Sequence, residues 1–244
     1  MKRIIIIGAT SGIGNEVAKE YLKAGFRIGI AGRRAEALET FREAAPERIV
    51  TRQLDVTQED AREKLRLLID ELGGMDIFLL CSGIGNQNIK LTSDIEINTA
   101  KTNVVGFVRM VDTAFSYFKQ KGEGHLAVIS SIAGTKGLGS APAYSATKRF
   151  QNTYIDALAQ LAHMEKLKIR FTDIRPGFVA TALLKDRSYP LLMQPEKVAR
   201  HIIRALEKGK RVAIIDKRYA VLVFFWRLIP RWLWERLPIR NDQQ

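Results

Sequence analysis

Tyr144 and Lys148, in the segment AYSATKR, have side chains whose types and spacing could carry acid–base chemistry. On a helix, residues four apart lie on the same face, one turn from each other. An ammonium beside a phenol favours the phenolate and lowers the phenol pKa from about 10 toward neutrality. Such a tyrosine can give a proton to a carbonyl oxygen or accept one in reverse. Because the same spacing occurs on many solvated helices, the pair needs support from its surroundings.

Ser131 supplies part of that support, because it stands 13 residues before Tyr144 in VISSIAG, where an apolar run ends. In open parallel sheets, ligands bind at the edge formed by the carboxyl ends of the strands. Ser130 is the nearby alternative at this edge. From its place along the strand, Ser130 is expected to point away from the site, which favours Ser131 as the functional serine.

Three glycines, Gly8, Gly12 and Gly14, follow the apolar run Ile4–Ile7 and precede a segment of helical period. Glycine permits a tight turn and close backbone approach to a pyrophosphate, and the helix N-terminus adds amides and a positive dipole. Strand, glycines and helix in this order predict a dinucleotide site. A glycine-rich turn without a ligand is the alternative.

The residues after the second predicted strand indicate which dinucleotide is bound. Rossmann proteins that bind NAD carry an acidic residue there for the ribose 2′-hydroxyl. This chain instead has Gly32, Arg33 and Arg34, and a guanidinium pairs well with a phosphate. We therefore predict NADP(H) in preference to NAD(H). The alternative is a pair of surface arginines at a helix start, a position that the helix dipole slightly disfavours for cations.

Short apolar runs alternate with segments of helical period along most of the chain, and runs such as IIIIG are apolar at every position, as in parallel strands covered on both faces. The pattern predicts an α/β fold: a Rossmann-like doubly wound parallel sheet of about seven strands flanked by helices. The expected strands are Arg3–Ile7, Arg27–Ala31, Arg48–Leu54, Asp76–Cys81, His125–Ser130, Lys168–Ile174 and Arg211–Ile215, and the expected helices are Ile13–Ala24, Arg34–Ala45, Glu59–Leu72, Ser93–Lys121, Ala143–Glu165 and Pro195–Lys208.

The 244 residues, 46% of them hydrophobic, suffice for one domain, expected at residues 1–216 and followed by a tail at residues 217–244. With 27% charged residues, disordered and collagen-like proteins are excluded. A single cysteine, Cys81, forms no disulfide within the chain and belongs to no zinc-binding cluster, so we expect no metal and a cytoplasmic location. The apolar run Ile4–Ile7 is too short for a signal peptide or a membrane span.

The tail combines basic and aromatic residues. The formal charge of the chain is +13, and residues 201–244 hold ten Lys or Arg against four Asp or Glu. Arginines beside tryptophan and phenylalanine suit a membrane interface better than a nucleic-acid groove, so we expect no nucleic-acid partner. We predict an amphipathic helical tail in peripheral contact with the inner face of a membrane; a subunit contact or a flap over the substrate mouth are the alternatives. The residues concerned are Phe224, Phe225, Trp226, Arg227, Arg231, Trp232, Trp234, Arg236 and Arg240.

With G-x-x-x-G-x-G at Gly8–Gly14, a serine at a strand end and Y-x-x-x-K, the chain resembles the short-chain dehydrogenase/reductase family over residues 1–216. It departs from the family pattern at Ile7, where threonine is usual, and at Cys81-Ser82-Gly83, where the family has N-N-A-G. The resemblance implies an NAD(P)-dependent enzyme that interconverts a ketone and a secondary alcohol, in a homodimer or homotetramer. A catalytically silent nucleotide-binding regulatory protein of the same fold is the alternative.

The resemblance also implies roles for individual residues. Ser131 would orient the substrate oxygen, Tyr144 would protonate it, and Lys148 would tune Tyr144 and hold the ribose. Asn103 would hold a water that resupplies the proton; an ordinary polar residue in mid-helix is the alternative. The cofactor would contact Gly8, Thr10, Ser11, Gly12, Ile13, Gly14, Arg33, Arg34, Asp55, Val56, Ser82, Gly83, Tyr144, Lys148, Pro176, Gly177, Val179 and Thr181.

Two of these cofactor contacts have structural alternatives, because Asp55 and Thr181 could each cap a helix. By the same resemblance, residues 178–194 would form a lid over the substrate. Its side chains are largely apolar, which favours a lipid-, steroid- or aromatic-like carbonyl, unless they simply pack on the domain. They include Phe178, Leu183, Leu184, Tyr189, Leu191, Leu192 and Met193.

Overall fold

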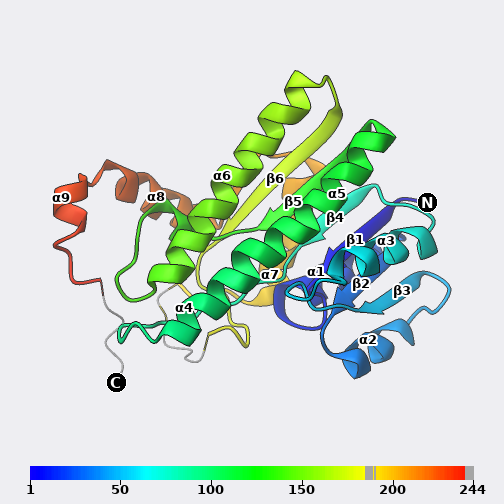
Figure 1. Ribbon diagram of the computed structural model, residues 1–244, viewed down its shortest axis with the longest axis horizontal. Coiled ribbons are helices and arrows are strands. Elements are labelled where there is room, and N and C mark those ends of the chain that lie inside the picture. The colour runs from blue at the N-terminus through cyan, green and yellow to red at the C-terminus, as the bar shows by residue number, and fades with distance from the viewer. Residues whose placement is uncertain (185–188, 190, 240–244) are drawn as a thin grey trace.

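The computed structural model describes residues 1–184, 189 and 191–239. Its central sheet is entirely parallel, with the strand order β3-β2-β1-β4-β5-β6-β7 (Figure 1). The order reverses between β1 and β4, which opens a crevice at the carboxyl ends of these strands. The predicted seven-stranded, doubly wound sheet is confirmed. The strands are β1 Arg3–Ile7, β2 Arg27–Gly32, β3 Ile49–Gln53, β4 Ile77–Leu80, β5 Glu123–Ile129, β6 Lys168–Pro176 and β7 Val212–Ile215.

Helices cover both faces of the sheet, which explains the uninterrupted apolar run of β1. Ile5 and Ile7 belong to one buried cluster and Ile4 and Ile6 to the other, and none of the four is exposed. Successive side chains of a strand point to opposite faces, so an apolar run serves both clusters. The first cluster lies under α3 Ala61–Glu71, α5 Phe107–Lys121 and α6 Pro142–Met164; the second lies under α1 Gly12–Lys23, α2 Ala35–Arg42 and α7 Pro195–Glu207.

The long helix expected at Ser93–Lys121 is interrupted. It consists of α4 Ser93–Ala100, the π-helical turn η1 Lys101–Gly106 and α5. Such turns often mark functional sites in proteins. A short 3₁₀ helix, η2 Ile132–Thr135, follows β5 and was not expected either. Both irregular segments border the crevice.

The tail is helical, as expected, with α8 Lys217–Leu228 and α9 Arg231–Trp234, but the expected amphipathic pattern is not found in α8, which has apolar side chains on both its buried and its exposed side. Tyr219 and Val223 of α8 are buried. Figure 1 places the tail, in orange and red, at the end of the molecule opposite the N-terminus. Apolar side chains also occupy the outer side of α8, and among the described residues no helix has the length and apolar character of a membrane span. Arg240 lies outside the described residues.

Candidate active site

The end of β5 and the start of α6 bring three predicted catalytic side chains together. Ser131 precedes η2, and its Oγ accepts a hydrogen bond from the amide of Ala133 at 3.1 Å. The Ser131 hydroxyl interacts with the Tyr144 phenol and favours its ionised form. Lys148, one turn further along α6, holds its Nζ atom 5.7 Å from the centre of the Tyr144 ring. A phenol, a hydroxyl and an amine thus face one position at the carboxyl edge of the sheet.

Ser130 points elsewhere, into a buried polar network. Its hydroxyl donates to the carboxylate of Asp173 and accepts from Nδ2 of Asn152 at 2.8 Å. Arg175 pairs with the same carboxylate at 2.6 Å. Because these partners occupy its hydroxyl, Ser130 braces the base of the site and Ser131 faces Tyr144.

The electrostatics of the pair differ from the sequence prediction. Burial raises the pKa of the Tyr144 phenol, and the hydrogen bond with Ser131 only partly offsets this. Burial also lowers the pKa of Lys148 to about 8, against the opposing pull of the Asp173 carboxylate and of Cys81. The expectation of a lowered phenol pKa is therefore wrong for this structure: removal from water disfavours the phenolate more than its neighbours stabilise it. Burial therefore favours the neutral, protonated phenol.

Asn103, in η1, fastens the loop after β4 to the helix. Its Oδ1 accepts from the amide of Ile84 at 2.9 Å, and its Nδ2 donates to the carbonyl of Ile84 at 2.7 Å and to Oγ1 of Thr147 at 3.1 Å. Gly83 is held close to Lys148, since a Cβ at Gly83 would be 3.4 Å from its Nζ. Asn103 is thus a structural tie within the site, whereas the expected role in holding a water stays a prediction.

Gln151 is a site residue that sequence reasoning missed. It is buried on α6, three residues after Lys148, and its side chain links Lys148 to the backbone of Asn103. Residues three apart share a helix face. The sequence feature that could have identified Gln151 was therefore a polar side chain on the same helix face as Lys148.

The turn between β1 and α1 has no room for side chains. A Cβ at Gly14 would be 2.3 Å from the carbonyl oxygen of Gly8, and a Cβ at Gly8 would be 2.7 Å from the amide nitrogen of Ser82. Gly8 also has a φ of +89°. Thr10, Ser11 and Ile13 are at least partly exposed. A cradle of backbone at a helix N-terminus fits the pyrophosphate of a dinucleotide.

Arg33 and Arg34 are both exposed beside this turn. Arg34 donates to the carbonyl of Thr10 at 2.7 Å, so its guanidinium lies over the glycine loop. A Cβ at Gly32 would be 2.8 Å from Cγ2 of Thr10. An acidic side chain at position 32 would therefore require Thr10 to move.

Asp55 and Val56 line the loop after β3. Oδ1 of Asp55 accepts from the amide and the hydroxyl of Thr57 at 2.9 and 2.8 Å. The following helix begins only at Ala61, with Asp60 at its N-cap, so Asp55 forms a turn rather than a helix cap. Val56 packs against Gly106 of η1, because a Cβ at Gly106 would be 2.6 Å from Cγ2 of Val56.

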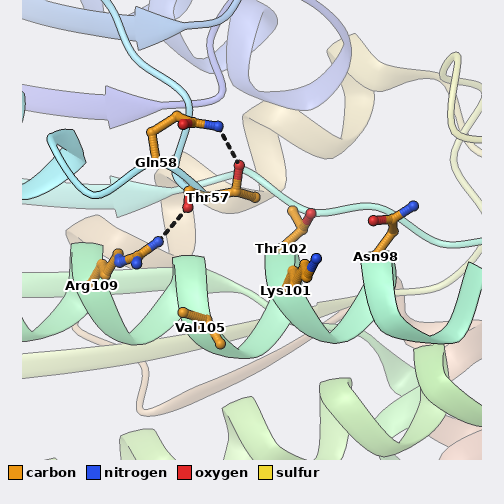
Figure 2. Close-up of a pocket in the computed structure, with 7 residues that line it drawn as sticks. All are labelled: Thr57, Gln58, Asn98, Lys101, Thr102, Val105 and Arg109. Carbon is orange, nitrogen blue, oxygen red and sulfur yellow. Dashed lines mark hydrogen bonds between the residues drawn. The ribbon is translucent and has the colours of Figure 1, made fainter. Parts of the chain in front are cut away.

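A cavity of about 540 Å³ opens beside this loop (Figure 2). Figure 2 shows Arg109 reaching the Thr57 backbone and Gln58 pointing at the Thr57 hydroxyl. The cavity contains none of the predicted catalytic side chains, so it lies beside the site and is not part of it. Its lining is Thr57, Gln58, Asn98, Lys101, Thr102, Val105 and Arg109.

The turn after β6 connects the site with the tail. Pro176 ends β6, and the ring of Tyr219 lies against Gly177. The amide of Phe178 donates to the Tyr219 hydroxyl at 3.1 Å, which donates to the carbonyl of Leu191 at 3.2 Å. Thr181 caps no helix. It lies beside Gly12, because a Cβ at Gly12 would be 3.1 Å from Cγ2 of Thr181.

Within the predicted lid, Val179 and Met193 are buried and pair with each other, and the rings of Phe178 and Tyr189 lie 4.4 Å apart. Leu183 and Leu191 are exposed. Residues 185–188 and 190 of the predicted lid lie outside the described part of the chain. The lid segment therefore presents both packed and exposed apolar side chains.

The tail also contacts the loop after η2. Lys136 donates to the carbonyl of Ile229 at 2.7 Å, and Nε1 of Trp234 donates to the carbonyl of Gly137 at 2.7 Å. The Lys136 ammonium lies over the Trp234 ring, 5.4 Å from its centre. The tail is thus fastened to the two loops that follow β5 and β6.

Comparisons with known proteins agree on a family and a fold. A family model described as short chain dehydrogenase matches residues 2–190. The chain is 30% identical over 239 residues to an uncharacterized oxidoreductase of Myxococcus xanthus, covering 95% of this chain and 94% of that protein. A solved short-chain dehydrogenase from Streptomyces avermitilis is similar with a TM-score of 0.81 at 24% identity, covering 93% and 92% of the two chains. The closed form of serine dehydrogenase complexed with NADP+ is similar with a TM-score of 0.78 at 22% identity, covering 87% and 94%.

Proposed function

This chain belongs to the short-chain dehydrogenase/reductase family of NAD(P)-dependent oxidoreductases, and we propose that it reduces an apolar ketone to a secondary alcohol with NADPH. The observation that carries this proposal is the grouping of Ser131, Tyr144 and Lys148 at the carboxyl edge of the sheet. A protonated phenol is the form that donates a proton, which favours the reducing direction.

The residues present fit a nicotinamide dinucleotide. The turn at Gly8, Gly12 and Gly14 would hold the pyrophosphate, Lys148 beside Gly83 would hold the nicotinamide ribose, and Pro176-Gly177 would border the nicotinamide. When bound, the reduced cofactor supplies the hydride.

The protein side chains supply the proton and the positioning. Ser131 hydrogen-bonds the substrate oxygen and orients it toward the phenol of Tyr144, which transfers its proton to that oxygen. Lys148, as an ammonium, stabilises the resulting phenolate. The buried setting strengthens each of these electrostatic interactions.

Preference for NADP(H) rests on Arg33, Arg34 and Gly32. The Arg34 guanidinium lies over the glycine loop, and an acidic residue at position 32, as in NAD-binding proteins, would require the Thr10 side chain to move. The serine dehydrogenase complex with NADP+ supports the same cofactor. Steady-state kinetics with both cofactors test this: Arg34→Ala should raise KM for NADPH roughly tenfold or more and leave KM for NADH nearly unchanged. A wild-type preference for NADH would contradict it.

An apolar substrate is supported by the side chains of the lid, where the rings of Phe178 and Tyr189 pack together and Leu183 and Leu191 are exposed. The test is NADPH consumption with steroid, sphingoid-type, fatty and small aromatic carbonyls, with and without detergent. Turnover confined to small charged carbonyls would contradict the proposal. Turnover of any ketone would also exclude the silent regulatory alternative, which the complete Ser131, Tyr144 and Lys148 set already disfavours.

Peripheral membrane contact is supported by the outer side of the tail. Val221, Phe224, Phe225, Leu228 and Trp232 are each more than half exposed. Arginines stand among them, so an anionic bilayer surface complements the patch. In vesicle flotation, Phe224→Ser with Phe225→Ser should release the protein from anionic vesicles, whereas Val212→Ser, another exposed apolar residue, should not.

Flotation unchanged by these tail substitutions, or absent for the wild type, would contradict membrane contact. A change in oligomeric state in the same variants would favour the subunit-contact alternative, read out by light scattering. The homodimer or homotetramer implied by the family stays a prediction.

A further inference from the structure

Lys148 is held by two direct hydrogen bonds. Its Nζ donates to the carbonyl of Ile129 at 3.1 Å and to Oε1 of Gln151 at 3.0 Å. Gln151 is 1% exposed, so its amide is removed from water and depends on these partners. The first contact comes from the end of β5 and the second from the next turn of α6.

The other end of the Gln151 amide is fixed as well. Its Nε2 donates to the backbone carbonyl of Asn103 at 2.9 Å, within the π-helical turn η1. An ammonium can only donate and a backbone carbonyl can only accept, so one orientation of the amide satisfies both neighbours. The two contacts therefore lock Gln151 in place, and through it they lock the amine of Lys148.

The charges around this amine come from several elements. Tyr144 lies on the same helix, Cys81 follows β4, and Asp173 lies on β6. The Asp173 carboxylate is engaged by Arg175 at 2.6 Å and by Asn152 at 2.9 Å. The hydrogen-bond acceptors in direct contact with Nζ that the structure gives are therefore neutral, from Ile129 and Gln151.

We propose that Gln151 is a positioning residue for the reaction, holding the Lys148 ammonium between the Tyr144 ring and Gly83 by a direct side-chain link to η1. The role is relevant to catalysis only if the proposed reductase function holds. Because the amide accepts a hydrogen bond from the ammonium, it favours the charged form of Lys148 and opposes the effect of burial.

The first test uses a readout that needs neither substrate nor turnover. NMR titration of protein labelled with ¹³C at lysine Cε follows the Lys148 resonance, which is assigned by its loss in Lys148→Arg. Gln151→Leu removes the acceptor and should move the titration midpoint of Lys148 to lower pH. Gln151→Glu adds a countercharge and should move it to higher pH. Gln160→Leu and Gln160→Glu, at an exposed position on the same helix, should leave it unchanged.

The second test follows turnover with the ketone that gives the greatest NADPH consumption. Gln151→Leu should lower kcat by roughly 10- to 100-fold with little change in KM for the ketone, because orientation is lost and substrate binding is kept. In Gln151→Glu, the alkaline limb of the kcat–pH profile should move upward with the NMR midpoint. Thermal unfolding identifies any variant that fails to fold. If Gln151→Leu does not fold, the test rests on Gln151→Glu, whose side chain is close in shape to that of glutamine.

The outcomes separate the two proposals. An unchanged Lys148 midpoint in well-folded Gln151 variants would overturn the positioning role even if the enzyme is active. A shifted midpoint with wild-type kcat would restrict Gln151 to a structural role, which also overturns the proposal. If no ketone is reduced and NADPH does not bind, the reductase function fails, and the positioning proposal fails with it even where the titration moves.

Discussion

The ring of Tyr219 lies against Gly177, so close that a Cβ at Gly177 would be 2.2 Å from the Cζ atom of Tyr219. Tyr219 belongs to the tail, and Gly177 to the turn that borders the predicted nicotinamide site. The Tyr219 hydroxyl adds contacts with Phe178 and Leu191, the first and one of the last residues of the lid. The Tyr219 ring thus connects the tail with the lid.

Gly177→Ala should therefore displace the Tyr219 ring. We expect a loss of about 1–3 kcal/mol of unfolding free energy, typical of overpacking in a buried contact, and faster hydrogen exchange in α8 than in the wild type. Urea unfolding and hydrogen-exchange mass spectrometry measure the two effects. Gly137→Ala is the matched control, because a Cβ there would contact nothing within 4 Å; equal effects of both substitutions would contradict the role of the ring.

Tyr144→Phe should remove nearly all turnover while leaving NADPH binding intact. The phenol is the proposed proton donor, and loss of general acid catalysis costs about 10²- to 10⁴-fold in kcat. Steady-state kinetics and NADPH fluorescence measure the two quantities. Tyr154→Phe, on the same helix but packed against Phe107 and Phe150, is the control that should keep activity. Substantial residual turnover in Tyr144→Phe would refute the assignment.

Lys148 should make the stability of the protein depend on pH in the alkaline range. Its pKa is lowered by burial to about 8 from an ordinary value of 10.5. Between these values the unfolded chain binds the proton more readily than the folded chain, so stability increases with pH. Relative to Lys148→Met, the wild type should gain on the order of 1–3 kcal/mol of unfolding free energy from pH 7.5 to 10.

Urea unfolding of both proteins across this range measures the difference. The same comparison with Lys208→Met, at an exposed position, should show almost no pH dependence. A wild-type stability that falls relative to Lys148→Met as the pH rises would contradict the buried position of this amine.

His125 should make the protein sensitive to acid. Its ring is buried, hydrogen-bonded through Nε2 to Thr172 Oγ1 at 2.8 Å, and burial lowers its pKa from 6.5 to about 4. Protonation is therefore easier in the unfolded chain, and stability is lost as the pH falls from 6.5 toward 4. In His125→Gln, the loss of unfolding free energy between pH 6.5 and 4 should be smaller than in the wild type by on the order of 1–3 kcal/mol. His163→Gln, at an exposed helical position, should follow the wild type in urea unfolding; a wild-type dependence in His125→Gln would exclude this histidine as the cause.

Much of the fold was predictable, because the local patterns and the tertiary structure agree. The all-apolar run of β1 indicated a strand covered on both faces, and Ile4 to Ile7 alternate between the two buried clusters. The glycines at positions 8 and 14 indicated a turn without side-chain room, which the contact between Gly14 and Gly8 explains. Periodicity and glycine spacing are local properties, and the sequence displays them directly.

Other features depend on partners far apart in the chain. Gln151 matters because its amide meets Asn103, 48 residues away, and periodicity does not reveal that contact. The raised pKa of Tyr144 follows from burial, which the spacing to Lys148 does not indicate. The Lys101–Gly106 irregularity lies in a segment whose residues fit an uninterrupted helix, so its position is set by packing of Gly106 on Val56 and by the ties of Asn103.

The π-helical turn η1 contains one residue more than a regular turn of the helix, and each residue of an α-helix accounts for about 100° of rotation. The helices before and after η1 can therefore direct their contact faces independently: α4 toward the loop after β4, and α5 toward the sheet. Deleting one residue from this turn would rotate α4 by about 100° relative to α5 and take it away from α6, where the Glu96 carboxylate accepts a hydrogen bond from the amide of Ala143 at 3.0 Å. The extra residue therefore sets the position of α4 beside the start of the helix that carries Tyr144.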